Sequence, residues 1–224
     1  MAGIPDAGMT KKNSIYLSEY FMGAACVLTV AAGIASLVLC VGQQDTFAVF
    51  GLLVRLVTAI AMYQSFRRFK WDVAKGLMGG ALFSIMYHEA FLVLVRLWGE
   101  QDFDLYLAAG VQGSLYLASA GMAFLMTVII TINHFFINYA IQGNPKNMIL
   151  NRIAILFKLV VYILLLVSNS RLDFAAAALW KNALLVLTDM FLLLLLVNIE
   201  SQFDSFNALR QELRKEKRKG RSNK

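Results

Sequence analysis

Cysteine, proline and charged side chains are all scarce in this chain. Of its 224 residues only 2 are cysteine and 2 are proline, 16% are charged, and 59% are hydrophobic. Cys26 and Cys40 lie fourteen residues apart in one apolar run, or about 21 Å along a helix, which is too far for a disulfide. So apolar a composition excludes an ordinary soluble domain, which needs a polar surface.

The sequence also lacks the motifs of several enzyme classes. It contains no G-x-x-x-x-G-K-[ST] segment to cradle a nucleotide phosphate. The segment "YHEAF" begins like the H-E-x-x-H zinc motif, but Leu92 stands where the second histidine is needed. Ser114 and His88 fall at different expected depths, which disfavours an intramembrane serine protease. We therefore expect no enzymatic activity, no metal and no cofactor.

The chain does contain a series of long apolar runs. Runs of 18 or more apolar residues predict transmembrane helices, and their continuous Leu, Val, Ile and Ala content excludes alternating barrel strands. The predicted fold class is all-α, a polytopic membrane helix bundle with six transmembrane helices. The predicted spans are approximately residues 17–41, 47–65, 76–98, 105–137, 153–168 and 175–199. The first run is too long for a cleavable signal peptide, so it is expected to be a retained anchor.

Basic and non-basic connections alternate between these spans. "FRRFKWDVAKG", between spans two and three, carries four basic residues, whereas "GEQDFD", between spans three and four, carries three acids and no base. Under the positive-inside rule this alternation places both termini in the cytoplasm. The predicted domains are a six-helix transmembrane domain, 1–200, and a basic amphipathic cytoplasmic tail, 201–224. High Ala and Leu content and short loops fit a bacterial cytoplasmic (inner) membrane.

Ionisable side chains inside the predicted spans are the candidate functional groups. A charge at the centre of a membrane helix costs roughly 2.5–3.5 kcal/mol, so these groups are expected to face the bundle interior. His88 and Glu89 lie about twelve residues into their span, about 18 Å deep and close to mid-bilayer. By depth, the predicted partner of Glu89 is Arg55. The candidates for a substrate or ion pathway are Arg55, His88, Glu89, Gln112 and Asp189.

Two interpretations of these charges remain open. In the first, they line a polar path on which Glu89 or Asp189 takes and releases a proton or cation, with His88 as a relay. In the second, they form satisfied pairs that fix helix register. Lys158, about five residues inside its span, is predicted to reach the cytoplasmic surface with its long side chain.

Other polar groups are expected near helix ends. Arg96 lies close enough to the outer edge of its span to extend to the surface. Glu19 and His134 lie near cytoplasmic helix ends and are predicted to be interfacial. Small residues at four-residue spacing let helix backbones approach closely. Such stripes, predicted to pack within the chain or else between copies of it, are Ala25, Thr29 and Gly33 in the first span and Gly110, Ser114 and Ala118 in the fourth.

The C-terminal segment combines an apolar helix face with basic residues. Phe203, Phe206, Leu209 and Leu213 fall on one side of a helix. The residues predicted to contact anionic lipid headgroups are Arg210, Arg214, Lys215, Lys217, Arg218 and Lys219. The alternative for this segment is a simple positive-inside stop signal. Nucleic-acid binding is not expected, because the basic part lacks interleaved aromatics.

Together these features predict an integral membrane protein that serves as a small-solute or ion transporter or channel subunit. The intramembrane charged cluster would be its functional site. The alternative is a non-transporting membrane subunit or scaffold, which anchors or regulates a partner complex through the basic tail. The expected partners are the lipid bilayer with its anionic headgroups and either a homo-oligomer or a partner membrane subunit.

Overall fold

The computed structural model describes residues 7–68, 70–97, 102–135, 145–170, 180–200 and 202, which are helical except for short turns and contain no strand. The elements are α1 (Ala7–Gly42), α2 (Thr46–Arg67), α3 (Trp71–Ala90), the π-helix η1 (Phe91–Leu97), α4 (Asp102–Ala108), α5 (Gly110–Phe135), α6 (Pro145–Asn169) and a helix Trp180–Glu200. The predicted all-α class is confirmed.

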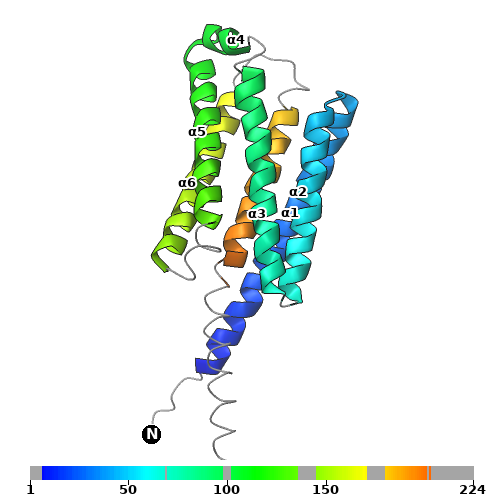
Figure 1. Ribbon diagram of the computed structural model, residues 1–224, viewed down its shortest axis with the longest axis vertical. Helices are drawn as coiled ribbons and strands as arrows, with labels where there is room; N and C mark the ends of the chain where they lie inside the picture. The colour runs from blue at the N-terminus through cyan, green and yellow to red at the C-terminus, as the bar shows by residue number, and fades with distance from the viewer. Residues whose placement is uncertain are drawn as a thin grey trace, which may run out of the picture.

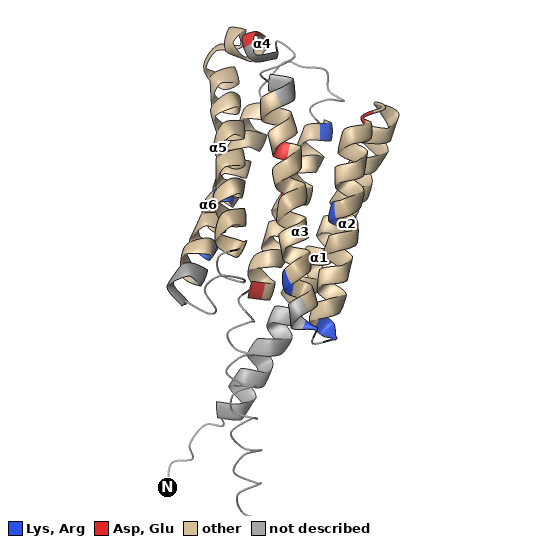
Figure 2. Ribbon diagram, viewed as in Figure 1, with Lys and Arg blue, Asp and Glu red and all other residues tan. Residues whose placement is uncertain are grey.

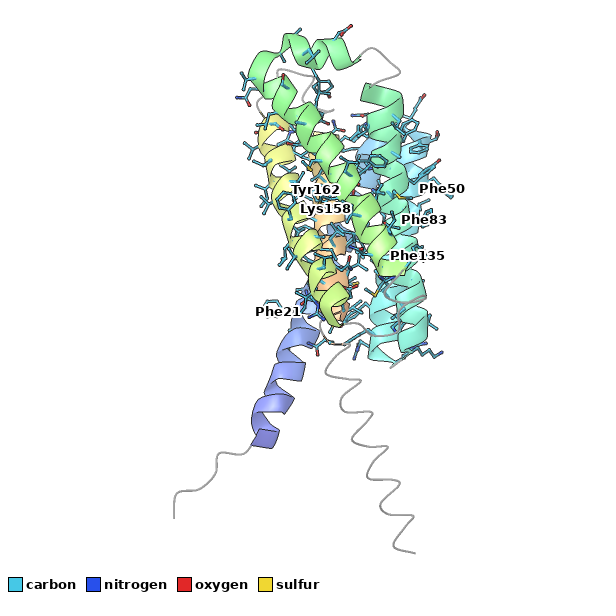
Figure 3. The ribbon with its side chains drawn as sticks, turned by 60° about the vertical axis from the view of Figure 1, so that its left-hand side comes forward. Phe21, Phe50, Phe83, Phe135, Lys158 and Tyr162 are labelled. Atoms are coloured by element: carbon cyan, nitrogen blue, oxygen red, sulfur yellow. The ribbon has the colours of Figure 1, made fainter. Side chains whose placement is uncertain are left out.

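Six of the described helices are long and apolar enough to cross a membrane. Their apolar spans are Tyr20–Gly42, Thr46–Arg67, Val73–Leu94, Gly110–Phe135, Ile149–Asn169 and Trp180–Glu200, the last of which we call the sixth span. Large apolar side chains cover the outside of the bundle, where Phe50 is 65% exposed and Phe83 is 52% exposed (Figure 3). Such a surface suits lipid rather than water, and it makes this chain a multi-pass membrane protein.

The helices form one bundle with two distinct ends (Figure 1). α1 and α2 lie on one side and α5 and α6 on the other, with α3 and the sixth span between them. The sixth span packs against its neighbours through leucines that are almost fully buried, Leu192, Leu193, Leu195 and Leu196. The α1–α2 turn and α4 lie at one end, which we call the Asp45 end, and the α2–α3 connection lies at the opposite, Glu200 end.

The single long fourth span predicted for residues 105–137 is wrong at its start. The helix is interrupted at Ala109, and α4 is separate from α5. Gly110, the first residue of α5, has a φ of 67°, a left-handed conformation that glycine adopts without steric cost. The backbone carbonyl of Tyr106 then comes so close to Gly113 that a Cβ there would lie 1.7 Å from its oxygen. α4 therefore folds back over the end of α5.

The two small-residue stripes behave differently. Ala25, Thr29 and Gly33 of α1 are buried, and a Cβ on Gly33 would lie 2.5 Å from Cδ2 of Leu56, so α1 and α2 are in close contact there. By contrast, all three residues of the fourth-span stripe, Gly110, Ser114 and Ala118, are exposed. The prediction that this second stripe packs within the chain is therefore wrong.

Candidate functional site

The Glu89 carboxylate is buried near the end of α3 and accepts hydrogen bonds from two other helices. The Lys158 ammonium lies 2.6 Å from Glu89 Oε1, and the Tyr162 hydroxyl donates to the same oxygen at 2.7 Å. The Thr127 hydroxyl contacts Glu89 Oε2. We call these four residues the Glu89 site. One buried anion is thus balanced by one buried cation, and both carboxylate oxygens are satisfied.

α6 supplies two of these groups from one face. Lys158 and Tyr162 are four residues apart, which places them one above the other on a helix. The Lys158 ammonium lies 4.5 Å from the centroid of the Tyr162 ring, within reach of a cation–π contact. It also donates to the backbone carbonyl of Ala123 at 2.7 Å and contacts the Thr127 hydroxyl. Figure 3 shows Lys158 and Tyr162 in the interior, where α6 runs beside α5.

The prediction that Lys158 extends to the membrane surface is wrong. Its side chain is 0% exposed, because a carboxylate, a hydroxyl and a carbonyl inside the bundle replace its water shell. The sequence contained one usable signal, an amine and a phenol at four-residue spacing on an otherwise apolar helix face. That pattern shows a polar face but does not identify the helix that it meets.

A second buried ion pair lies between α2 and the sixth span. Arg55 is 0% exposed and Asp189 is 2% exposed. Arg55 Nε lies 3.1 Å from Asp189 Oδ1, and Arg55 Nη2 donates to the backbone carbonyl of Ser84 at 3.3 Å. The predicted Arg55–Glu89 pair is therefore wrong. The sequence predicted a similar membrane depth for Arg55 and Glu89. The rotation of each helix and its choice of neighbours direct the two side chains to different partners.

The geometry of this second pair is looser than that of the Glu89 site. The two atoms are close, yet their orientation is not that of a hydrogen bond. Within the described part of the chain, Arg55 Nε, Arg55 Nη1 and Asp189 Oδ1 have no hydrogen-bond partner. A buried charge with unfilled hydrogen bonds is costly. Arg55 and Asp189 can therefore form further hydrogen bonds, to water or to another polar group.

Each end of the bundle also carries an ionic contact. At the Asp45 end, Lys181 Nζ lies 2.9 Å from Asp45 Oδ2, while Asp45 Oδ1 accepts the backbone N–H of Ala48 at 3.1 Å and caps α2. This contact joins the sixth span to the α1–α2 turn. Asp45 therefore holds two elements with its two oxygens.

At the Glu200 end, the sixth span meets α5 and α6. Asn151 Nδ2 donates to Glu200 Oε1 at 3.0 Å, and Arg152 Nη2 donates to the Glu200 backbone carbonyl at 3.1 Å. His134 Nδ1 lies 3.7 Å from the same Oε1 atom. His134 lies next to the end of α5 as predicted, and its side chain is 1% exposed because neighbouring helices cover it at that end of the bundle.

A cavity of about 30 Å³ opens near the Asp45 end. Its polar lining comes from five segments of the chain: Asp45, His88, Tyr116, Asn169 and Asn182. His88 is half-buried and directly precedes Glu89 in the sequence. Phe47 and Phe91, which also line the cavity, stack with their ring centroids 3.8 Å apart. The structure thus places His88 on the wall of a mostly apolar cavity that carries a few polar groups.

The remaining predicted residues have no demonstrated place in the site. Gln112 is half-buried near the start of α5. The side chain of Arg96 and the six basic tail residues between 210 and 219 lie outside the described residues, so the headgroup predictions stay predictions. Over the described ranges, no group of three or more His, Cys, Asp or Glu is placed to hold a metal ion.

Comparisons with protein-family models, curated proteins and solved structures gave no match for this chain. The class to which it belongs therefore follows from its own fold. It is a multi-pass helical membrane protein, and charged groups in its interior form ion pairs between helices.

Proposed function

We propose that this protein transports a small solute or ion across the membrane, with the Glu89 carboxylate as the group that binds and releases the cargo. The supporting observation is the convergence of Lys158, Thr127 and Tyr162 on Glu89 in the apolar interior. Stability alone does not explain why an ion pair is buried here, because apolar residues of similar volume often stabilise a protein interior equally well. Intramembrane ionisable residues commonly mark ion or substrate pathways.

The site contains the parts needed for an exchange of positive charge. Lys158 has three oxygen partners, namely Glu89, Thr127 and the carbonyl of Ala123. When a positively charged cargo binds Glu89, repulsion moves the ammonium toward the other two oxygens, where it stays hydrogen-bonded. When the cargo leaves, the ammonium returns to the carboxylate. In this mechanism the interior never holds an unpaired anion, which would be strongly disfavoured in a low dielectric.

The proposed orientation places both termini in the cytoplasm. Blue positions gather at the Glu200 end of the bundle, where α2 meets α3 (Figure 2). Arg67 and Arg68 end α2 there, and Lys70 precedes α3. Excess basic residues favour the cytoplasmic side. The Asp45 end would then face outward from a cytoplasmic membrane, which labelling of single cysteines at each end with an impermeant reagent would test.

The transport proposal is tested by comparing single and paired substitutions in proteoliposomes. Glu89→Gln leaves Lys158 without its counter-charge, so this variant is expected to lose both stability and flux. Glu89→Gln combined with Lys158→Met removes both charges, and it should regain thermal stability but not flux of protons or monovalent cations. Asp104→Asn, at an exposed position on α4, is the matched control and should retain both.

Recovery of full flux in the paired variant would overturn the proposal. The ion pair would then serve only to hold α3 against α6. The anchoring-subunit alternative would take precedence, and it has its own test. Deletion of residues 210–224 should abolish the biological activity of an anchoring subunit without changing the thermal stability of the bundle.

A further inference from the structure

We infer that the cargo is a proton and that it reaches Glu89 from the Asp45 end, through water in the cavity and the imidazole of His88. This inference rests on the proposed function and adds the identity of the cargo and its route. Three observations on different elements carry it: the coordination available at Glu89, the volume and lining of the cavity, and the position of His88 between the two.

The coordination at Glu89 favours a proton over a metal cation. Hard metal cations need about six or more oxygen ligands. The Glu89 site offers the carboxylate and two hydroxyls, with the Lys158 ammonium 2.6 Å from the carboxylate. That ammonium repels a second full cation held nearby. A proton needs only one carboxylate oxygen, and it neutralises Glu89 without adding bulk.

The cavity has the volume to hold water, and its mostly apolar wall carries a few polar groups that can bind it. At about 30 Å³ it exceeds the roughly 10–15 Å³ that one water needs by the same measure, so about two waters fit. Asn169 and Asn182 provide amide donors and acceptors on its wall, and Tyr116 provides a hydroxyl. A buried water needs two to four such partners. The cavity is too small for an organic solute of ordinary size, which also favours the smallest cargo.

His88 connects the cavity to the Glu89 site through its place in the sequence of α3. It lines the cavity, and Glu89 follows it in α3, with the two side chains about 100° apart around the helix. α6 makes the same connection, because Leu165 lines the cavity three residues after Tyr162, which donates to Glu89. The π-helix η1 begins at Phe91, two residues after Glu89, and π-helical turns often occur at functional sites.

The proton balance closes with groups that the structure contains. A hydrated proton in the cavity protonates the neutral imidazole of His88. The imidazolium then transfers one proton to the Glu89 carboxylate, which becomes a neutral acid, and His88 returns to its neutral form. The other charged or titratable groups facing the cavity are Tyr116 and Asp45, and Asp45 is paired with Lys181. That pair is neutral overall, so it adds no net charge to the cavity wall.

The test measures proton flux into proteoliposomes with an internal pH-sensitive dye. His88→Gln keeps an amide in place of the imidazole but cannot carry a proton, so flux should fall at least tenfold and lose its dependence on external pH near neutrality. His134→Gln, the same change at the Glu200 end, should keep that pH profile. Retention of both flux and pH profile in His88→Gln would overturn the inference.

Two further results separate this inference from the proposed function. If the paired variant Glu89→Gln with Lys158→Met is stable but lacks flux while His88→Gln retains it, the route is wrong and the transport site stands. If neither change affects flux, the proposed function fails as well. An effect of Glu89→Gln on the flux of a monovalent cation alone would contradict the proton as cargo.

Water access to the cavity is measured independently of flux. In a background of Cys26→Ala and Cys40→Ala, Asn182→Cys should react with silver ions, a thiol-binding probe small enough to enter with water, when they are added from the Asp45 side only. Leu193→Cys, fully buried on the same helix, is the matched control and should stay unlabelled. An unreactive Asn182→Cys protein would show that the cavity is closed to water and would overturn the inference.

Discussion

Arg55 Nε lies 3.1 Å from Asp189 Oδ1, and this contact joins α2 to the sixth span in the apolar interior of the bundle. The sixth span makes further polar contacts at both of its ends, through Lys181 to the α1–α2 turn and through Glu200 to α5 and α6. Helices in lipid gain little from the hydrophobic effect when they associate, so polar contacts and close packing carry much of the specificity. Polar contacts thus hold the sixth span at three positions along its length, namely at Lys181, Asp189 and Glu200.

The Arg55–Asp189 pair predicts strong coupling between its two members. Asp189→Leu leaves the arginine charge buried and unpaired, so unfolding free energy should drop by about 3–5 kcal/mol. The double variant Arg55→Met with Asp189→Leu should recover most of that loss, because no charge stays buried. Thermal denaturation of the native protein, of Arg55→Met and Asp189→Leu singly, and of the double variant in detergent gives the coupling energy. Additive losses in the double variant would show that the two residues act separately.

The same substitution, threonine to valine, is expected to have opposite effects on stability at Thr127 and Thr131, which lie on one helix. Thr127→Val removes a hydroxyl that contacts both Glu89 and Lys158, and should cost about 1–3 kcal/mol. Thr131 Oγ1 is buried without a hydrogen-bond partner in the described part of the chain, so Thr131→Val should be neutral or stabilising. The melting temperatures of the two variants test this difference. Equal losses of stability in both variants would contradict the contacts assigned to Thr127.

Asp45 is predicted to act through two separable contacts. Asp45→Asn keeps an oxygen that can accept the Ala48 N–H but loses the charge that pairs with Lys181. Asp45→Ala loses both, and the missing helix cap should add about 1 kcal/mol to its cost. Urea denaturation in mild detergent measures the difference. If the two variants were equally stable, the side chain would not cap α2.

Gly113 is predicted to be essential for docking α4. A Cβ there would lie 1.7 Å from the Tyr106 carbonyl oxygen, and backbone cannot yield as a flexible side chain does. Gly113→Ala should destabilise by about 1–3 kcal/mol and disturb the stacking of Tyr106 on Tyr116, whose ring centroids are 4.7 Å apart. Gly121→Ala, with nothing within 4 Å of its Cβ, should instead stabilise α5 by about 0.5–1 kcal/mol.

Tyrosine fluorescence and thermal denaturation of these two glycine variants provide the measurement. Both changes add one methyl group to the same helix, so helix propensity alone predicts a gain in each. A stable Gly113→Ala protein would mean that α4 does not rest on α5 as the structure shows.

The apolar runs of the sequence determined most of the fold. Their length required six spanning helices, since only a helix satisfies all its backbone groups within one segment in lipid. The cost of burying charge also required Arg55, Glu89 and Asp189 to face inward, and each of them is at most 5% exposed. These conclusions needed only local composition and the physics of the bilayer.

Which charges would meet was decided only by the tertiary structure. Sequence position gives the depth of a residue, but a pair also depends on the rotation of each helix and on which helices are neighbours. Lys158 and Arg55 show this, because both found partners on helices distant in the sequence. Likewise, the break at Ala109 goes with a close approach between Tyr106 and Gly113, which no hydropathy pattern contains. Contacts between segments are set by packing around the whole bundle, whereas hydropathy acts on each segment alone.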